Sequence, residues 1–259
     1  MLEALLDQFR RGDRQAFSRL LTLASNGEIP QQVLDQALSS PKRSKVVAVT
    51  GSGGVGKSTL IGKLIPLIRK ENQTVGILAC DPRSPLTGGA LLGDRFRMVS
   101  STSLSNPTED DGVFIRSLAA APGHGAVAAN LAPMIRLFDA FGFDLVIIET
   151  VGAGQGDTAV RDLADVVVLL LQPETGDELQ WEKAGLLEVT DIVVIHKGDL
   201  PGAEETETQV RDVLALSEGK SAKVLRVSSK SGHGVEALWQ AIKSVQRAGT
   251  VMTPVPNGV

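Results

Sequence analysis

The feature that most constrains this chain is a glycine-rich stretch between a short apolar run and a long amphipathic one. Residues 45–50 (KVVAVT) are rich in valine and predict a buried strand, and helical spacing of apolar residues begins at Thr59. Between them lies GSGGVGKS, from Gly51 to Ser58, which matches GxxxxGK[ST] in the strand–loop–helix context that this pattern requires. Glycines let successive backbone amides turn toward an anion, and the next helix adds the positive end of its dipole. The stretch therefore predicts a site for a nucleoside triphosphate.

The side chains of this loop have separate expected roles. Lys57 is expected to contact the β- and γ-phosphates, and the Ser58 hydroxyl is expected to bind Mg²⁺. The residues expected to contact the nucleotide are Gly51, Ser52, Gly53, Gly54, Val55, Gly56, Lys57, Ser58 and Thr59. The loop alone does not distinguish GTP from ATP.

Length and composition narrow the remaining classes. A chain of 259 residues suits one α/β domain with a small appendage, and its 3% aromatic content predicts an aliphatic core. The net charge of −4 and the lack of a dense Lys/Arg block argue against nucleic acid or a membrane as main partner. With the single cysteine Cys80, no signal-peptide layout and no apolar run near roughly 18 residues, we expect a cytoplasmic protein.

The amino-terminal part, residues 1–40, is predicted to be a helical extension. Its apolar residues follow helical spacing and are interrupted just before Asp13, which suits the N-cap of a second helix. A third short helix is expected over Ile29–Leu38. Residues 41–248 would form the nucleotide-binding domain, and residues 249–259 resemble a frayed tail.

The nucleotide-binding domain is predicted to alternate strands and helices. The predicted strands are residues 45–50, 75–80, 144–149, 165–171, 191–195 and 223–228. The predicted helices are residues 58–71, 126–141, 177–188, 204–217 and 234–246. Near-continuous runs of Val, Ile and Leu are typical of strands buried on both faces of a parallel sheet. The expected fold is therefore α/β with a doubly wound, mostly parallel sheet and ligands at the carboxyl ends of its strands.

Residues 82–125 do not follow this alternation. They contain PRSPLTGGALLGD and SSTSLSNPTEDDG and show little periodicity. Long irregular loops within a compact domain are usually functional or disordered, so we expect a mobile switch beside the triphosphate.

Three acidic residues are placed where a metal-binding or water-orienting group is needed. Asp81 closes one predicted strand, Glu149 ends another, and Asp94 follows within the irregular loop. The carboxyl ends of parallel strands meet at one edge of the sheet, beside the phosphate loop. Carboxylates there can bind Mg²⁺ or orient the attacking water, although Asp94 fits a solvated loop position equally well.

The sequence HKGD, His196 to Asp199, follows a buried strand at the point where GTPases carry Asn-Lys-x-Asp. The two oxygens of Asp199 would accept hydrogen bonds from guanine N1–H and the 2-amino group, and adenine offers neither donor there. Lys197 would extend along the base, and His196 replaces the usual asparagine. A second loop at the base is expected from Ser228, Ser229 and Lys230. The pattern favours GTP and GDP over adenine nucleotides.

Three longer segments resemble the MeaB/ArgK/MMAA family of GTPase chaperones of cobalamin-dependent acyl-CoA mutases. They are residues 47–98, the run IIETVGAGQGDT, and the run QPETGDELQWEKAGLLEVTDIVVIHKGD. The resemblance covers roughly residues 10–245. It implies a GTPase that docks on a methylmalonyl-CoA-type mutase, gates adenosylcobalamin delivery and protects the mutase.

The resemblance also implies roles for individual residues. Asp81, Asp94 and Glu149 match the metal-site acids, Lys57 and Ser58 keep their phosphate and Mg²⁺ roles, and Gln155 falls in the second switch. The set implied to act in catalysis is Lys57, Asp94, Glu149 and Gln155. Residues 173–184 match the third switch, and the side chains expected to face the mutase are Asp177, Glu178, Gln180 and Lys183.

Two departures from the family pattern keep alternatives open. His196 stands where the family has asparagine, and residues 249–259 are not expected to form the helical arm that joins two subunits in the family. A homodimer therefore stays an open alternative that would not use that arm. The other candidate functions are a metallochaperone-type GTPase, which would need His/Cys clusters, and a transport-linked ATPase or kinase.

Overall fold

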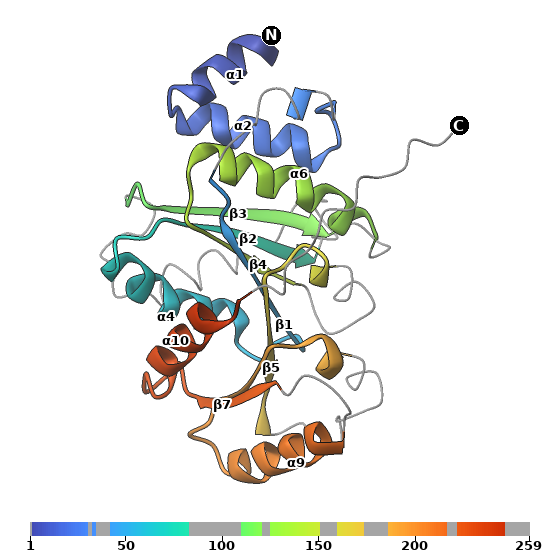
Figure 1. Ribbon diagram of the computed structural model, residues 1–259, viewed down its shortest axis with the longest axis vertical. Coiled ribbons are helices and arrows are strands. Elements are labelled where there is room, and N and C mark those ends of the chain that lie inside the picture. Colours follow the sequence, from blue (N-terminus) through green and yellow to red (C-terminus); the bar gives the residue numbers. More distant parts are fainter. Residues whose placement is uncertain are drawn as a thin grey trace.

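The computed structural model describes residues 2–30, 33–34, 42–82, 110–120, 125–150, 160–173, 186–216 and 222–246. These residues contain a seven-stranded sheet in the order β3-β2-β4-β1-β5-β6-β7, in which every neighbouring pair is parallel (Figure 1). The strands are β1 (Lys45–Gly51), β2 (Val75–Pro82), β3 (Val113–Ala120), β4 (Leu145–Glu149), β5 (Val166–Leu171), β6 (Ile192–His196) and β7 (Lys223–Val227). The chain builds outward from the central strand β1 in both directions, which creates a topological switch point beside it.

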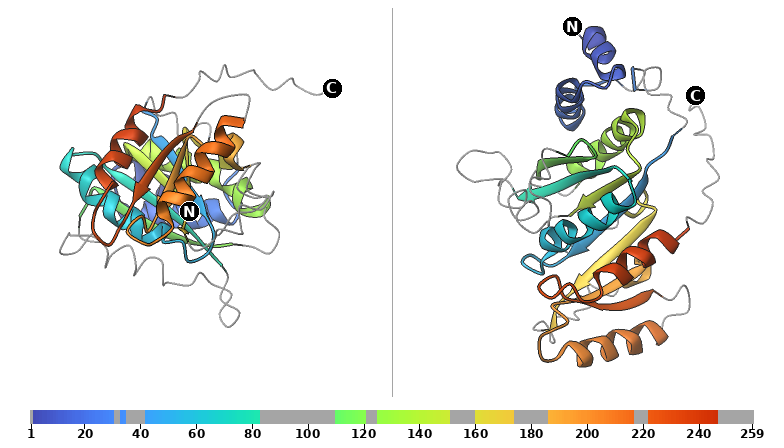
Figure 2. Two further views of the ribbon diagram at one scale, coloured as in Figure 1. Left: turned by 90° about the horizontal axis from the view of Figure 1, so that it is seen from below. Right: turned by 90° about the vertical axis from the view of Figure 1, so that its left-hand side faces the viewer.

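Helices cover both faces of the sheet (Figures 1 and 2). They are α4 (Lys57–Lys70), α6 (Gly125–Phe141), α9 (Ala203–Leu216) and α10 (Val235–Ser244). Val168 and Leu170 of β5 point into the cluster with α4 and α10, whereas Leu169 and Leu171 of the same strand pack with α9. All six residues of β5 are buried, as expected for a strand covered on both faces. The predicted doubly wound α/β class is confirmed.

Two amino-terminal helices, α1 (Leu2–Arg10) and α2 (Arg14–Ser25), form a further layer on α6 (Figure 2). Asp13 is the N-cap of α2, as predicted, and its carboxylate accepts hydrogen bonds from Gln15 N at 2.7 Å and Ala16 N at 2.9 Å. Leu20 and Leu21 of α2 are fully buried in the core cluster that includes α6. The amino-terminal helices therefore share a core with the sheet.

Six phenylalanines concentrate at this junction, although the chain as a whole is poor in aromatics. Phe17 is fully buried, and its ring contacts the rings of the other five, with centroid separations from 4.5 to 5.9 Å. These are Phe9 of α1, Phe114 of β3, and Phe138, Phe141 and Phe143 in and just after α6. The cluster joins α1, α2, α6 and the edge of the sheet.

The irregular stretch 82–125 contains a strand that the sequence prediction missed. Val113–Ala120 forms β3, which pairs with β2 in parallel and forms one edge of the sheet. Val113 and Ile115 point into the cluster under α4, while Phe114 packs against the opposite cluster. This alternation was hidden because Arg116 and Ser117 interrupt the apolar run and the preceding residues lack periodicity.

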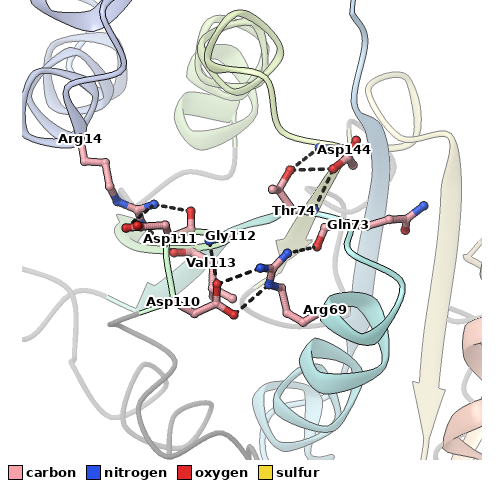
Figure 3. A network of polar contacts seen from close by, with 9 residues as sticks. All are labelled: Arg14, Arg69, Gln73, Thr74, Asp110, Asp111, Gly112, Val113 and Asp144. Carbon is pink, nitrogen blue, oxygen red and sulfur yellow. Dashed lines mark hydrogen bonds and ion pairs between the residues drawn. The ribbon is translucent and has the colours of Figure 1, made fainter.

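A polar network holds the amino-terminal edge of β2, β3 and β4 (Figure 3). Arg69 of α4 donates to both oxygens of Asp110, at 2.8 and 3.0 Å. Arg14 of α2 donates to the carbonyl oxygens of Asp111 at 2.5 Å and Val113 at 2.7 Å. Two arginines from different layers thus fix the residues that lead into β3.

Several other predictions fall partly outside the described residues. Of the predicted third helix over Ile29–Leu38, the structure describes residues 29–30, which are not helical, and residues 33–34, which are; the predicted start at Ile29 is therefore wrong. Of the helix predicted over 177–188, it describes residues 186–188. The predicted tail lies outside the described residues, and the other predicted elements agree with the structure to within about two residues at each end.

Candidate nucleotide-binding site

The phosphate loop connects the central strand β1 to α4 and depends on glycine at two points. Gly51 has φ 146°, and a Cβ there would lie 2.5 Å from the carbonyl oxygen of Leu170 on β5. Gly56, the N-cap of α4, has φ 103°, in the left-handed region that other residues rarely adopt. The glycines therefore allow the loop to curl against β5 and present backbone amides beside the amino terminus of α4.

Lys57 and Ser58 lie at the start of α4 and both are buried. The Lys57 ammonium donates to the carbonyl oxygens of Gly51 at 2.8 Å and Ser52 at 3.1 Å. Its charge therefore lies over the phosphate loop. The Ser58 hydroxyl donates to a carboxylate oxygen of Glu149 at 2.7 Å. Ser58 and Glu149, the two predicted magnesium-site residues whose side chains the structure describes, are thus in direct contact.

Glu149 reaches this position because β4 pairs with β1. It lies beside Val49 in the register and is 4% exposed, so its carboxylate is buried at the carboxyl edge of the sheet. The serine hydroxyl and the carboxylate are hard oxygen donors, the type that Mg²⁺ prefers, and Mg²⁺ completes its shell with water and phosphate oxygens. In the described part of the chain, no group of three or more His, Cys, Asp or Glu side chains could hold a metal by itself. The residues present fit a magnesium ion shared with a nucleotide.

The other predicted acids lie at or beyond the limits of the described residues. The backbone of Asp81 lies near the end of β2, two residues past the position that pairs with Glu149. Asp94 and Gln155 lie outside the described residues, as do the mutase-facing residues Asp177, Glu178, Gln180 and Lys183.

His196 connects the phosphate loop to the loop that follows β7. Its Nδ1 lies 2.6 Å from the carbonyl oxygen of Val55, and its Nε2 lies 2.7 Å from the hydroxyl of Ser229. The side chain is buried, and this desolvation is the main reason why the pKa of His196 lies below its usual value. The sequence identified His196 as a substitution, but a bond to a backbone carbonyl leaves no signature in the sequence.

Asp199 differs from the other site residues because it is exposed to solvent. A hydrogen bond from Ser228 is the first cause that holds the pKa of Asp199 below its usual value, and the charge of Lys230 also lowers it. The carboxylate is therefore ionised at neutral pH and open to a ligand. The backbone turns sharply before it, since Lys197 has φ 55°, a conformation uncommon for residues other than glycine.

The loop after β7 forms a tight turn. Ser228 and Ser229 are buried, and Ser228 N donates to the carbonyl oxygen of His233 at 3.0 Å. The Gly198 amide donates to the carbonyl oxygen of Val227 at 3.0 Å, which fixes the HKGD turn to the end of β7. The two loops predicted to bind the base thus lie side by side.

One contact in the site was not anticipated from the sequence. The hydroxyl of Thr150, just after β4, donates to the hydroxyl of Thr50 at the end of β1, at 3.1 Å. Both side chains are buried, and Thr150 directly follows Glu149 in the chain. Their proximity follows from the β1–β4 pairing, which no local pattern specifies.

Among the described helices, none combines the length and apolar character that a membrane span requires.

The family model for the methylmalonyl-CoA mutase-associated GTPase MeaB matches residues 17–253. A Pyrococcus abyssi protein whose name assigns it as a GTPase is 39% identical over 250 residues, covering 94% of this chain and 75% of the relative. A fused isobutyryl-CoA mutase from Geobacillus kaustophilus is 36% identical over 217 residues, covering 80% of this chain and 19% of the relative.

Solved structures share the fold. The crystal structure of a LAO/AO transport system kinase matches with a TM-score of 0.72 and 24% identity, covering 94% of this chain and 74% of the other. The sequence matches agree with the geometry, because they span the phosphate loop, Glu149, His196 and Asp199. The chain belongs to the MeaB family of methylmalonyl-CoA mutase-associated GTPases.

Proposed function

We propose that this GTPase is a chaperone of an adenosylcobalamin-dependent acyl-CoA mutase and couples GTP hydrolysis to gated cofactor delivery and protection of the mutase. The observation that carries the proposal is the match to a family named for association with methylmalonyl-CoA mutase. A relative named as a fused isobutyryl-CoA mutase, with a similar segment in 19% of its length, supports a partner of the same class. The proposed setting is the cytoplasm.

The described residues support binding of the triphosphate end of GTP. Lys57 would exchange its bonds to the Gly51 and Ser52 carbonyl oxygens for phosphate oxygens. Ser58 and Glu149 would hold Mg²⁺, with Asp81 and Asp94 as further candidates from the sequence. When bound, Mg²⁺ neutralises charge on the phosphates. Gln155 is the proposed residue that orients the attacking water.

The guanine end would be read by Asp199. Its exposed, ionised carboxylate can accept two hydrogen bonds from guanine N1–H and the 2-amino group. Lys197 lies two residues before Asp199 in the chain, the charge of Lys230 acts on the Asp199 carboxylate, and Ser228 donates a hydrogen bond to it. Adenine lacks both donors, so a carboxylate desolvated by adenine would lose its hydrogen bonds with water and gain none.

Docking on the mutase is proposed through residues 82–117 and 173–184, with Asp177, Glu178, Gln180 and Lys183 as contact residues. We expect slow hydrolysis by the protein alone and a higher kcat with the mutase, because docking would raise the population of the catalytically competent state. If GTP-bound protein binds the mutase more tightly than GDP-bound protein, the mutase must favour GTP over GDP by the same factor.

The test is steady-state GTP hydrolysis with and without a methylmalonyl-CoA or isobutyryl-CoA mutase from the same source. The variant D177K/E178K/K183E should hydrolyse GTP alone at the normal rate and lose most of the stimulation. A matched control reverses charges on the exposed face of α9, in E205K/D212K. No stimulation by any such mutase, or stimulation that survives D177K/E178K/K183E, would exclude this docking surface.

A further inference from the structure

Three segments that are distant in the sequence meet at the side chain of His196. The phosphate loop contributes the Val55 carbonyl, β6 contributes the imidazole, and the loop after β7 contributes the Ser229 hydroxyl. Each ring nitrogen has a partner, at 2.6 and 2.7 Å respectively, and the side chain is 4% exposed.

The partners determine where the proton lies on the ring. A carbonyl oxygen only accepts, so Nδ1 must carry the hydrogen that is donated to Val55. In the neutral ring Nε2 then accepts from the Ser229 hydroxyl. Burial and the nearby charge of Lys197 both disfavour the imidazolium. Two hydrogen bonds therefore connect the segments in one direction: Ser229 donates to the imidazole, and the imidazole donates to the phosphate loop.

The ring also packs closely against the phosphate loop. A Cβ placed on Gly56 would lie 2.5 Å from Cε1 and 2.8 Å from Nδ1 of His196. Gly56 is the residue at which the loop turns into α4. The position of the imidazole is thus linked to the backbone that would face the phosphates.

At its other end, the hydrogen-bond connection through His196 leads to Asp199, the carboxylate that would bind the base. Ser228, next to Ser229, donates to Asp199. The Gly198 amide bonds to Val227 at 3.0 Å, immediately before the two serines. A change in the position of Ser229 would therefore move the frame that supports Asp199.

We propose that His196 is a positioning residue that couples the phosphate loop to the base-binding turn, so that phosphate binding and guanine recognition reinforce one another. This inference rests on the proposed guanine site. The imidazole acts through Val55 on one side and Ser229 on the other. An asparagine at this position could also donate to Val55 and accept from Ser229, whereas alanine could do neither.

The test measures dissociation constants for GDP and for pyrophosphate, the latter as a probe of the phosphate loop alone. H196A and S229A should each weaken GDP binding by about tenfold, the effect of losing about one buried hydrogen bond. The double variant H196A/S229A should bind GDP about as weakly as each single variant. The two single variants and the double variant all break the same link between Val55, His196 and Ser229. Pyrophosphate binding should weaken by a clearly smaller factor, and H196N should recover most of the GDP affinity.

A matched control is T190A. Thr190 is 2% exposed, donates to the Leu186 carbonyl at 2.6 Å, and lies just before the opposite end of β6. It should lower stability without weakening GDP binding. The coupling would be overturned if T190A weakened GDP binding as much as H196A does. It would also be overturned if the losses of GDP affinity in H196A and S229A added up in the double variant, or if H196A weakened GDP and pyrophosphate binding by the same factor. If H196A does not fold, S229A and H196N still decide the result. Wild-type protein that binds ADP as tightly as GDP would instead refute the guanine site itself.

Discussion

At the scale of single residues, the site contains two kinds of polar side chain. Lys57, Ser58, Glu149 and His196 are buried and hydrogen-bonded to protein atoms. Asp199 is ionised and exposed. The buried groups are held in position before a ligand arrives, which lowers the entropic cost of binding, while Asp199 offers open hydrogen-bond acceptors.

The identity of the base should depend on Asp199. D199N replaces one acceptor oxygen with a donor, so affinity for GDP should fall by about 100-fold and affinity for xanthosine diphosphate should rise, since xanthine has an oxygen where guanine has an amino group. The exposed residue Asp212 on α9 provides the control D212N. Competition binding with GDP, xanthosine diphosphate and ADP measures the change. Unaltered selectivity in D199N would show that another residue reads the base.

The buried imidazole should make stability depend on pH. In the folded protein the pKa of His196 is lowered from 6.5, first by burial and then by Lys197, although the Val55 carbonyl and Asp199 act in the opposite direction. The unfolded chain therefore binds this proton at a higher pH than the folded chain. The free energy of unfolding should fall as the pH decreases below about 6.5, until folded His196 is itself protonated.

This pH dependence can be measured by urea denaturation of wild type and H196N between about pH 5 and 8. The wild-type curve should lose stability more steeply toward low pH, because asparagine does not titrate. His124 and His233 are present in both proteins and cancel in the comparison. Parallel curves would mean that the imidazole is equally able to bind a proton in the folded and unfolded chains.

At the scale of elements, α1 and α2 contribute to the main core. Phe17 brings the amino-terminal layer into contact with β3 and α6 through ring contacts, and Arg14 bonds to the carbonyls that lead into β3. On the opposite face α4 runs from the phosphate loop to Arg69, which bonds to Asp110 at the same corner (Figure 3). The two faces are therefore joined at the start of β3.

Removal of the central ring should destabilise the whole fold. F17A deletes a fully buried side chain, and such changes cost about 3–5 kcal/mol in the free energy of unfolding. Urea denaturation should show one transition at lower denaturant, while R19A, on the exposed face of the same helix, should change stability by less than about 0.5 kcal/mol. A separate early transition in F17A, with the main one unchanged, would show that the helices unfold as an independent unit.

At the scale of the whole molecule, the candidate site lies at the carboxyl ends of the strands and is formed by residues from most of the chain. The phosphate loop follows β1, Glu149 ends β4, His196 ends β6 and the serine turn follows β7. The parallel order of the strands places all of these carboxyl ends on one side. A ligand that spans this edge would bind the folded chain and not the unfolded one.

Guanine nucleotide should therefore stabilise the molecule as a whole. At 100 times its dissociation constant, GDP with Mg²⁺ should add about 2.7 kcal/mol to the free energy of unfolding and raise Tm, while ADP at the same concentration should not. K57A should lose most of the GDP effect, whereas K70A, an exposed change at the other end of α4, should keep it. Thermal denaturation measures all of these shifts, and equal shifts with GDP and ADP would contradict guanine selectivity.

The sequence by itself determined the elements whose signals are local. The glycine pattern with Lys57 and Ser58, the apolar strands and the N-cap at Asp13 each depend on neighbouring residues, and all are present in the structure. Parallel sheet topology then follows from the alternation of strands and helices.

Only the tertiary structure decided which distant residues meet. The Ser58–Glu149 bond, the two bonds of His196 and the insertion of Phe17 between β3 and α6 join positions far apart in the chain. Strand order brings about the bonds of Ser58 and His196, and helix packing places Phe17; a pattern of neighbours carries no information on either. The edge strand β3 was missed for a related reason, because its pairing with β2 compensates for polar residues that weaken its local signal.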